Sequence, residues 1–238
     1  MDAANIARGI SIWGLPVLFA IIFHEVAHGW VAEKFGYSTA RRAGRITLNP
    51  ISHIDLIGTV LLPLILIAVG SKFLFGWAKP VPVNFSALRN PKRDMIWVAL
   101  SGPGTNFALA LLSAIALRLI IIVEPNAVMM ANQDVAPAAL REMGATVSVL
   151  VPIVLMLIAS IWINCVLMVL NLIPVPPLDG GRVLVGILPP SAAYSYSKVE
   201  PFGFMIVILL VFMLPQSQAI FYGIIRIFVS LFFMVASY

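Results

Sequence analysis

The sequence has a single cysteine, Cys165, and few charged residues. One cysteine cannot form a disulfide framework or a cysteine-rich zinc site. Charged residues make up 11% of the 238 residues, whereas hydrophobic residues make up 61% and the mean hydropathy is +1.02. Soluble globular domains carry about 25% charged residues. The composition therefore excludes a soluble domain and indicates a multi-pass membrane protein.

The basic residues outnumber the acidic ones, 15 to 10, and give a net charge of +5. They lie in short segments between apolar runs, as the positive-inside rule expects of cytoplasmic loops. No basic stripe interleaved with aromatic residues is present, so nucleic acid is not expected as a partner. The lipid bilayer is the expected partner, and the sequence gives no indication of an oligomeric state.

Several apolar runs are suited to helices that cross or enter a membrane. They cover residues 10–31, 57–74, 95–123, 147–172, 202–214 and 219–236, the last two separated by Pro215. Eight of the 15 basic residues lie in the segments on the two sides of the run 57–74, and Lys72 lies near its end, so we expect the run to re-enter the cytoplasmic side rather than span. The prediction is an α-helical polytopic membrane protein with about five to six transmembrane or re-entrant helices. It forms one domain over 1–238, with a core at about 10–190 and C-terminal helices at about 201–238.

A polar motif, His24-Glu25-Val26-Ala27-His28, interrupts the first apolar run. Residues four apart share one face of a helix, so both imidazoles can reach one Zn²⁺ ion while Glu25 lies beside them as a candidate general base. Ionisable side chains inside a membrane are costly, and they mark functional sites by default. The alternative is that these residues face the interior of the helix bundle without a metal.

A catalytic zinc site usually has three protein ligands, so the motif needs one more. The candidates are Asp179, His53, Asp55, Glu33 and Asp94. If the first helix runs inward, the following spans run outward and inward again, and Asp179 arrives at the level of the two histidines. A carboxylate in apolar surroundings needs a cation or a proton. These arguments favour Asp179 as the third ligand, with His53 next.

A second polar residue, Asn106, lies eleven residues into the run 95–123. At 1.5 Å per residue this places it about 16 Å deep, which is comparable to the expected depth of the metal. The residues before it, Ser101-Gly102-Pro103-Gly104-Thr105, are small enough to let another helix approach closely. Three distant segments are thus predicted to meet at one level.

Five motifs together resemble the site-2 protease family of intramembrane zinc metalloproteases. They are HEVAH, TLNPISHIDLIGT, FGWAKPVPVN, SGPGTN and NLIPVPPLDGGR, and they lie within residues 10–190. The chain is similar to the small prokaryotic members that have neither a PDZ domain nor a cystathionine-synthase-type domain.

The resemblance implies roles for individual residues. His24, His28 and Asp179 would be the zinc ligands, Glu25 the general base, and Asn106 a polar residue that helps to hold the substrate or the tetrahedral intermediate. The segments near residues 45–50 and 77–84 would form short membrane-embedded β-structure near the active site, whose edge pairs with an unfolded substrate strand.

The predicted function is an intramembrane zinc metalloendopeptidase that cleaves transmembrane segments of membrane-protein substrates. It would lie in the prokaryotic plasma membrane with one Zn²⁺ per chain and an active site toward the cytoplasm. The alternative is a zinc-binding or zinc-transporting membrane protein without peptidase activity, which requires further ligands along a path. Apart from Asn164, Cys165 and Arg226, the later helices offer almost none. A non-catalytic scaffold is disfavoured because the motif and Asp179 are intact.

Overall fold

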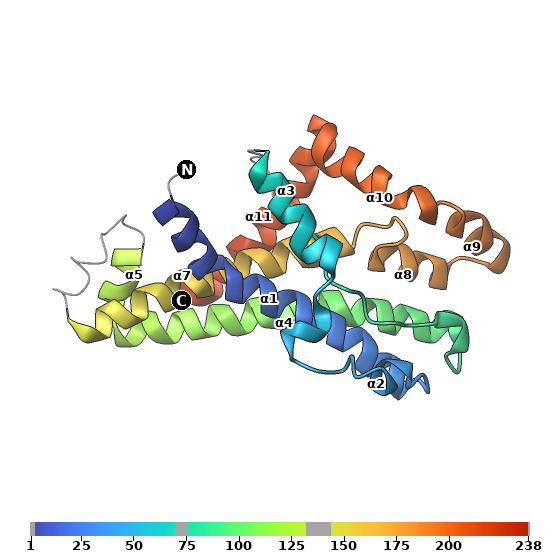
Figure 1. The fold of residues 1–238 in the computed structure, drawn as a ribbon, viewed down its shortest axis with the longest axis horizontal. Coiled ribbons are helices and arrows are strands. Elements are labelled where there is room, and N and C mark those ends of the chain that lie inside the picture. Colours follow the sequence, from blue (N-terminus) through green and yellow to red (C-terminus); the bar gives the residue numbers. More distant parts are fainter. Residues whose placement is uncertain (1–2, 70–75, 132–143, 238) are drawn as a thin grey trace. The chain divides into compact units, whose positions relative to one another are not determined.

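The computed structural model describes residues 3–69, 76–131 and 144–237, which are mostly helical (Figure 1). Among these residues, four helices are long and apolar enough to cross a membrane, and a bent pair, Pro190–Ser197 with Glu200–Val211, would make a fifth. The four are α1 (Ala3–Lys34), α4 (Pro91–Val123), α7 (Ala145–Asn171) and α11 (Pro215–Ser237). These helices confirm the prediction of a helical multi-pass membrane protein.

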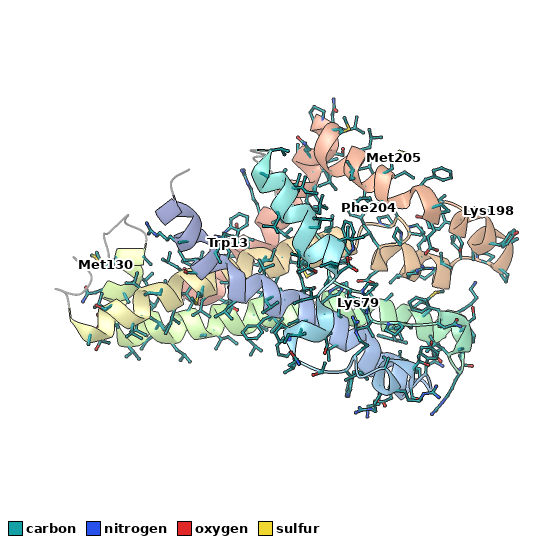
Figure 2. All side chains as sticks on the ribbon, in the orientation of Figure 1. Trp13, Lys79, Met130, Lys198, Phe204 and Met205 are labelled. Carbon is teal, nitrogen blue, oxygen red and sulfur yellow. The ribbon has the colours of Figure 1, made fainter. Side chains whose placement is uncertain are left out.

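Large apolar side chains project from these helices, as lipid-facing positions require (Figure 2). Trp13 on α1 is 44% exposed, and Met205, in the second helix of the bent pair, is 65% exposed. The shorter elements are α2 (Thr39–Arg42), η1 (Pro50–His53), η2 (Leu56–Leu61), α3 (Leu62–Ala68), η3 (Phe85–Ala87), α5 (Pro125–Ala131), α8 (Asp179–Ile187), α9 (Pro190–Ser197), α10 (Glu200–Ile208) and η4 (Leu209–Met213).

The predicted β-structure near residues 45–50 and 77–84 is not seen, because the described residues contain no strand. The backbone of the second segment bonds to scattered partners instead of a neighbouring strand. The Trp77 N–H donates to Gly58 O at 3.1 Å, and the Lys79 N–H donates to His53 O at 2.9 Å. Pro80 and Pro82 have no N–H to donate, so the edge of the segment on which they lie cannot form a complete ladder.

Trp77, three residues after the run 57–74, lies beside Gly58 near the start of that run. Besides the bond between Trp77 N–H and Gly58 O, the Thr59 hydroxyl donates to Trp77 O at 2.8 Å. A re-entrant hairpin requires such a meeting of its two ends. Residues 70–75, where the chain would turn, lie outside the described residues, and the re-entrant course stays a prediction.

The chain divides into two compact units. Unit 1 contains residues 1–20, 103–173 and 202–238, and unit 2 contains residues 21–102 and 174–201. Helices α1 and α4 each contribute to both units. The prediction of one membrane domain over 1–238 stays a prediction, because compact units of a helical bundle need not be separate domains.

Unit 1 contains a buried chain of polar side chains between helices. The Asn106 amide donates to Asn164 Oδ1 at 2.8 Å and to Ala20 O at 3.2 Å. The Asn164 amide donates to Ser160 O at 2.9 Å, and the Ser113 hydroxyl donates to Ser160 Oγ at 2.8 Å. Such bonds satisfy polar groups that lipid cannot solvate. They join α4 to α7 and to the first part of α1.

Unit 2 has a small apolar core that joins the end of α1 to the start of α4. Its buried members are Ala32, Leu88, Met95 and Val98. Partly buried side chains pack around them, and Val185 of α8 is among these. The core therefore holds the motif-bearing part of α1 beside α4 and α8.

Candidate active site

Three side chains of unit 2 converge on one point. His24 Nε2 lies 3.0 Å from His28 Nε2, and the two Asp179 oxygens lie 3.2 Å from His24 Nε2 and 3.3 Å from His28 Nε2. Ligands at zinc distances of about 2.0–2.2 Å in a tetrahedron are roughly 3.3–3.6 Å from one another. The three ligand atoms lie close to this spacing, and they form the one such group of His, Cys, Asp and Glu side chains in the described residues.

The surroundings of the Asp179 carboxylate indicate that the cluster suits a metal ion. Its Oδ2 atom is buried and accepts no hydrogen bond of normal geometry from the described residues, although it lies 3.2 Å from His24 Nε2. A buried anionic oxygen without a donor is costly. Burial opposes ionisation of Asp179, but the positive charge of a protonated His28 and hydrogen bonds from His24 and His28 outweigh it and lower the pKa of Asp179 to about 2. An ionised carboxylate beside two imidazoles is a donor set that suits zinc.

The orientation of His28 is set by α4. Its Nδ1 lies 2.7 Å from Val98 O. A carbonyl oxygen can only accept, so Nδ1 carries a proton, and Nε2 is the ring nitrogen that faces the other two ligands. In the neutral imidazole the lone pair is then on Nε2. The Ser101 hydroxyl donates to the same carbonyl at 2.6 Å. Helix α4 therefore selects the tautomer that a metal requires.

Asp179 is placed by the first turn of α8, which directly follows a proline-rich turn. A glycine pair after three prolines is typical of a turn, but the structure places Asp179 at the start of a helix. A Cβ atom on Gly181 would lie 2.2 Å from Pro176 N, so the turn packs on the helix only because residue 181 is glycine. The Arg182–Glu200 ion pair and the bond from Lys92 Nζ to Leu188 O anchor α8 along its length.

Gly102 of α4 lies directly against the two histidines. A Cβ atom there would be 2.5 Å from His24 Cε1 and 2.5 Å from His28 Nε2. The small residues of this motif were expected to admit another helix backbone. At position 102 they admit the imidazole rings instead.

We predict that Gly102→Ala lowers zinc affinity strongly, because the added methyl group must displace one or both imidazoles. Gly104→Ala is the matched control, since a Cβ atom at Gly104 meets nothing within 4 Å. Zinc per chain, measured by elemental analysis of the purified proteins, should fall for the first variant and stay at the wild-type value for the second. Equal zinc contents would contradict the close approach of α4.

The other four candidate ligands have different partners. Glu33 forms an ion pair with Arg41, and Asp94 Oδ2 accepts from Asn90 N–H at 2.8 Å. Asp55 Oδ1 accepts from Gly58 N–H at 2.7 Å at the start of η2, and His53 Nε2 lies 2.8 Å from Thr47 O. These contacts cap turns or stabilise loops, and none of the four residues joins the cluster.

Glu25 follows His24 directly and is partly buried. Its Oε2 atom accepts a hydrogen bond of 2.7 Å from the Val81 N–H. Sequence reasoning missed this partner because a backbone donor has no side-chain signature; the only indication was the pair of flanking prolines. Asn106 belongs to unit 1, and its predicted role at the metal stays a prediction.

Comparison with known proteins identifies the family. Residues 14–214 match the sequence model described as Peptidase family M50, which covers most of the chain. The chain belongs to peptidase family M50. This is the site-2 protease family, so the resemblance found in the motifs is confirmed.

Curated relatives agree with this family assignment. The chain is 35% identical over 206 residues to a Bacillus subtilis protein named "Putative zinc metalloprotease YwhC", covering 86% of this chain and 81% of the relative. It is 29% identical over 209 residues to "Putative zinc metalloprotease Rip2" of Mycobacterium tuberculosis, covering 87% of this chain and 69% of the relative. No solved structure shows significant similarity to the chain. The M50 chain is a zinc metalloprotease with several membrane helices.

Proposed function

We propose that this M50 protease is an intramembrane endopeptidase that cleaves transmembrane segments of membrane proteins. One zinc ion per chain would be held by His24 Nε2, His28 Nε2 and the Asp179 carboxylate. The observation that carries the proposal is the convergence of these three side chains within 3.0–3.3 Å contacts, on elements that include an apolar helix long enough to span a bilayer.

The protein residues would divide the chemistry between them. When bound, zinc supplies Lewis acidity, which makes water nucleophilic near neutral pH and polarises the scissile carbonyl. Glu25 takes a proton from the attacking water and delivers it to the nitrogen of the leaving amine. The Val98 carbonyl holds His28 in its ligating orientation. The role implied for Asn106, a polar residue that helps to hold the substrate or the tetrahedral intermediate, stays a prediction, because its side chain is buried within unit 1.

Substrate access would use the chain between α3 and α4. A helical substrate hides its carbonyls in its own hydrogen bonds, so it must unwind before cleavage. Within residues 77–81, the N–H groups of Trp77, Lys79 and Val81 all donate hydrogen bonds to other parts of the enzyme. The opposite edge of an extended chain would then be available to an unwound substrate, and the prolines make that edge rich in acceptors.

The active site would face the cytoplasm of a prokaryotic cell. Unit 2, which contains the cluster, also contains the basic residues Arg41, Arg42, Arg89, Lys92 and Arg93. Positive residues concentrate on the cytoplasmic side of membrane proteins. A zinc transporter would need further ligands, and the described residues form no second group of this kind.

Membrane proteomes of cells that carry the wild type or Glu25→Gln test this function. Transmembrane fragments should accumulate in the variant and be absent from the wild type. Glu33→Gln is the control on the same helix, because Glu33 is paired with Arg41 away from the cluster. Identical proteomes for all three proteins would contradict the proposal.

A further inference from the structure

The segment Pro80-Val81-Pro82 has one backbone N–H in three residues, and that N–H is used on Glu25. Val81 N donates to Glu25 Oε2 at 2.7 Å, and the Val81 residue is only 7% exposed. Hydrogen bonds from an N–H to a carboxylate are stronger than those between neutral groups. The prolines keep the backbone extended and leave no competing donor beside it.

The segment is fixed before it reaches Glu25. Lys79, labelled in Figure 2, donates its N–H to His53 O at 2.9 Å. Its carbonyl accepts from Arg45 Nη2, which also lies 3.4 Å from Pro80 O. Arg45 is a cation that is only 7% exposed, and it is buried against these two carbonyls. The N–H of Lys79 and the carbonyl groups of Lys79 and Pro80 are therefore all held by other residues of unit 2.

Gly29 explains how Val81 comes so close to α1. It lies one helical turn after Glu25 and therefore on the same face. A Cβ atom on Gly29 would be 2.9 Å from Val81 Cγ1 and 3.1 Å from Ala40 Cβ. The absence of a side chain at position 29 lets the segment approach until the Val81 N–H reaches the carboxylate.

We propose that the Val81 N–H is a positioning group for Glu25, and that Arg45 acts through the Lys79 and Pro80 carbonyls to hold it. This inference rests on the proposed function, in which Glu25 moves the proton. The bond fixes one carboxylate oxygen, Oε2, and directs Oε1 to the attacking water. The segment that borders the substrate thus also sets the geometry of the base.

Kinetics of Val81→Pro and Val81→Ala in liposomes test the proposal, with a synthetic transmembrane peptide that carries a fluorophore and a quencher. Proline removes the N–H, whereas alanine keeps it and reports the loss of the side chain alone. A bond to a charged group predicts a kcat about 10- to 100-fold lower for proline than for alanine. KM and zinc content should agree within about twofold. A change in KM with kcat unaltered would assign the N–H to substrate binding. A proline variant with a higher kcat would show that the bond hinders Glu25. Either result overturns the proposal.

Hydrogen exchange gives a measurement that needs no cleavage and no folded proline variant. The Val81 amide should exchange at least about tenfold faster in Glu25→Ala than in the wild type, while the Lys79 amide, bonded to His53 O, should not change. If the Val81 amide exchanged at the same rate in Glu25→Ala and in a wild type that cleaves the peptide, the positioning role would be overturned but the proposed function would not. A zinc-loaded wild type that cleaves nothing would overturn the proposed function, and this inference with it.

Discussion

Glu25→Gln should lower the rate of cleavage of a transmembrane peptide by about 10²- to 10⁴-fold, the range that a positioned general base contributes. Glutamine has the same size and can still accept from the Val81 N–H, but it cannot take a proton from water. The three metal-binding side chains are unchanged, so zinc per chain should stay at the wild-type value. Cleavage should be measured on purified enzyme in liposomes, with elemental analysis of the same samples.

The control for this substitution is Glu33→Gln. Glu33 is on the same helix eight residues later, and its carboxylate is paired with Arg41 rather than with the cluster. Its substitution should leave cleavage and zinc content near the wild-type values. If Glu25→Gln kept full activity, another group would have to be the base.

Asp179→Asn should remove most of the bound zinc. The substitution removes the negative charge from a side chain whose oxygens lie 3.2 and 3.3 Å from the two imidazole nitrogens. Changes in groups that only support metal ligands cost about 10–100-fold in affinity, so the loss of a charged ligand should exceed this. Competition with a fluorescent zinc chelator measures the affinity directly.

Asp94→Asn is the matched control for Asp179→Asn. Asp94 is buried, but it accepts from the Asn90 N–H, and an asparagine oxygen can accept the same bond. Zinc affinity should therefore be unchanged in this variant. A similar loss in both variants would show that Asp179 acts on the fold rather than on the metal.

The long helices were predictable because each is a predominantly apolar run of membrane length. The predicted runs 10–31, 95–123 and 147–172 correspond to α1, α4 and α7 with boundaries shifted by a few residues. The α8 helix was not predictable in the same way. Its first turn is Asp179-Gly180-Gly181, and two glycines after three prolines indicate a turn. The helix forms because its close packing on Pro176 and its anchors to Lys92 and Glu200 are tertiary contacts.

Part of the site was also predictable from the sequence. Spacing within one helix places His24 and His28 together, and the order of spans brings Asp179 to them. The contacts of Gly102, Val98 O and the Val81 N–H depend on the approach of separate segments, and backbone groups carry no residue-type signal. The predicted β-structure was wrong for the same reason. The N–H groups in residues 77–81 donate to three different elements and not to one neighbouring strand.

The central claim is that a zinc protease cuts peptide bonds within the apolar part of its substrate. It is tested most directly by mass spectrometry of the products formed from a synthetic transmembrane peptide in liposomes. The zinc-loaded wild type should produce fragments whose new ends lie inside the apolar segment. A chelator should stop their formation, and added zinc should restore it. New ends found only in the polar flanks, or no products from the zinc-loaded enzyme, would contradict the account.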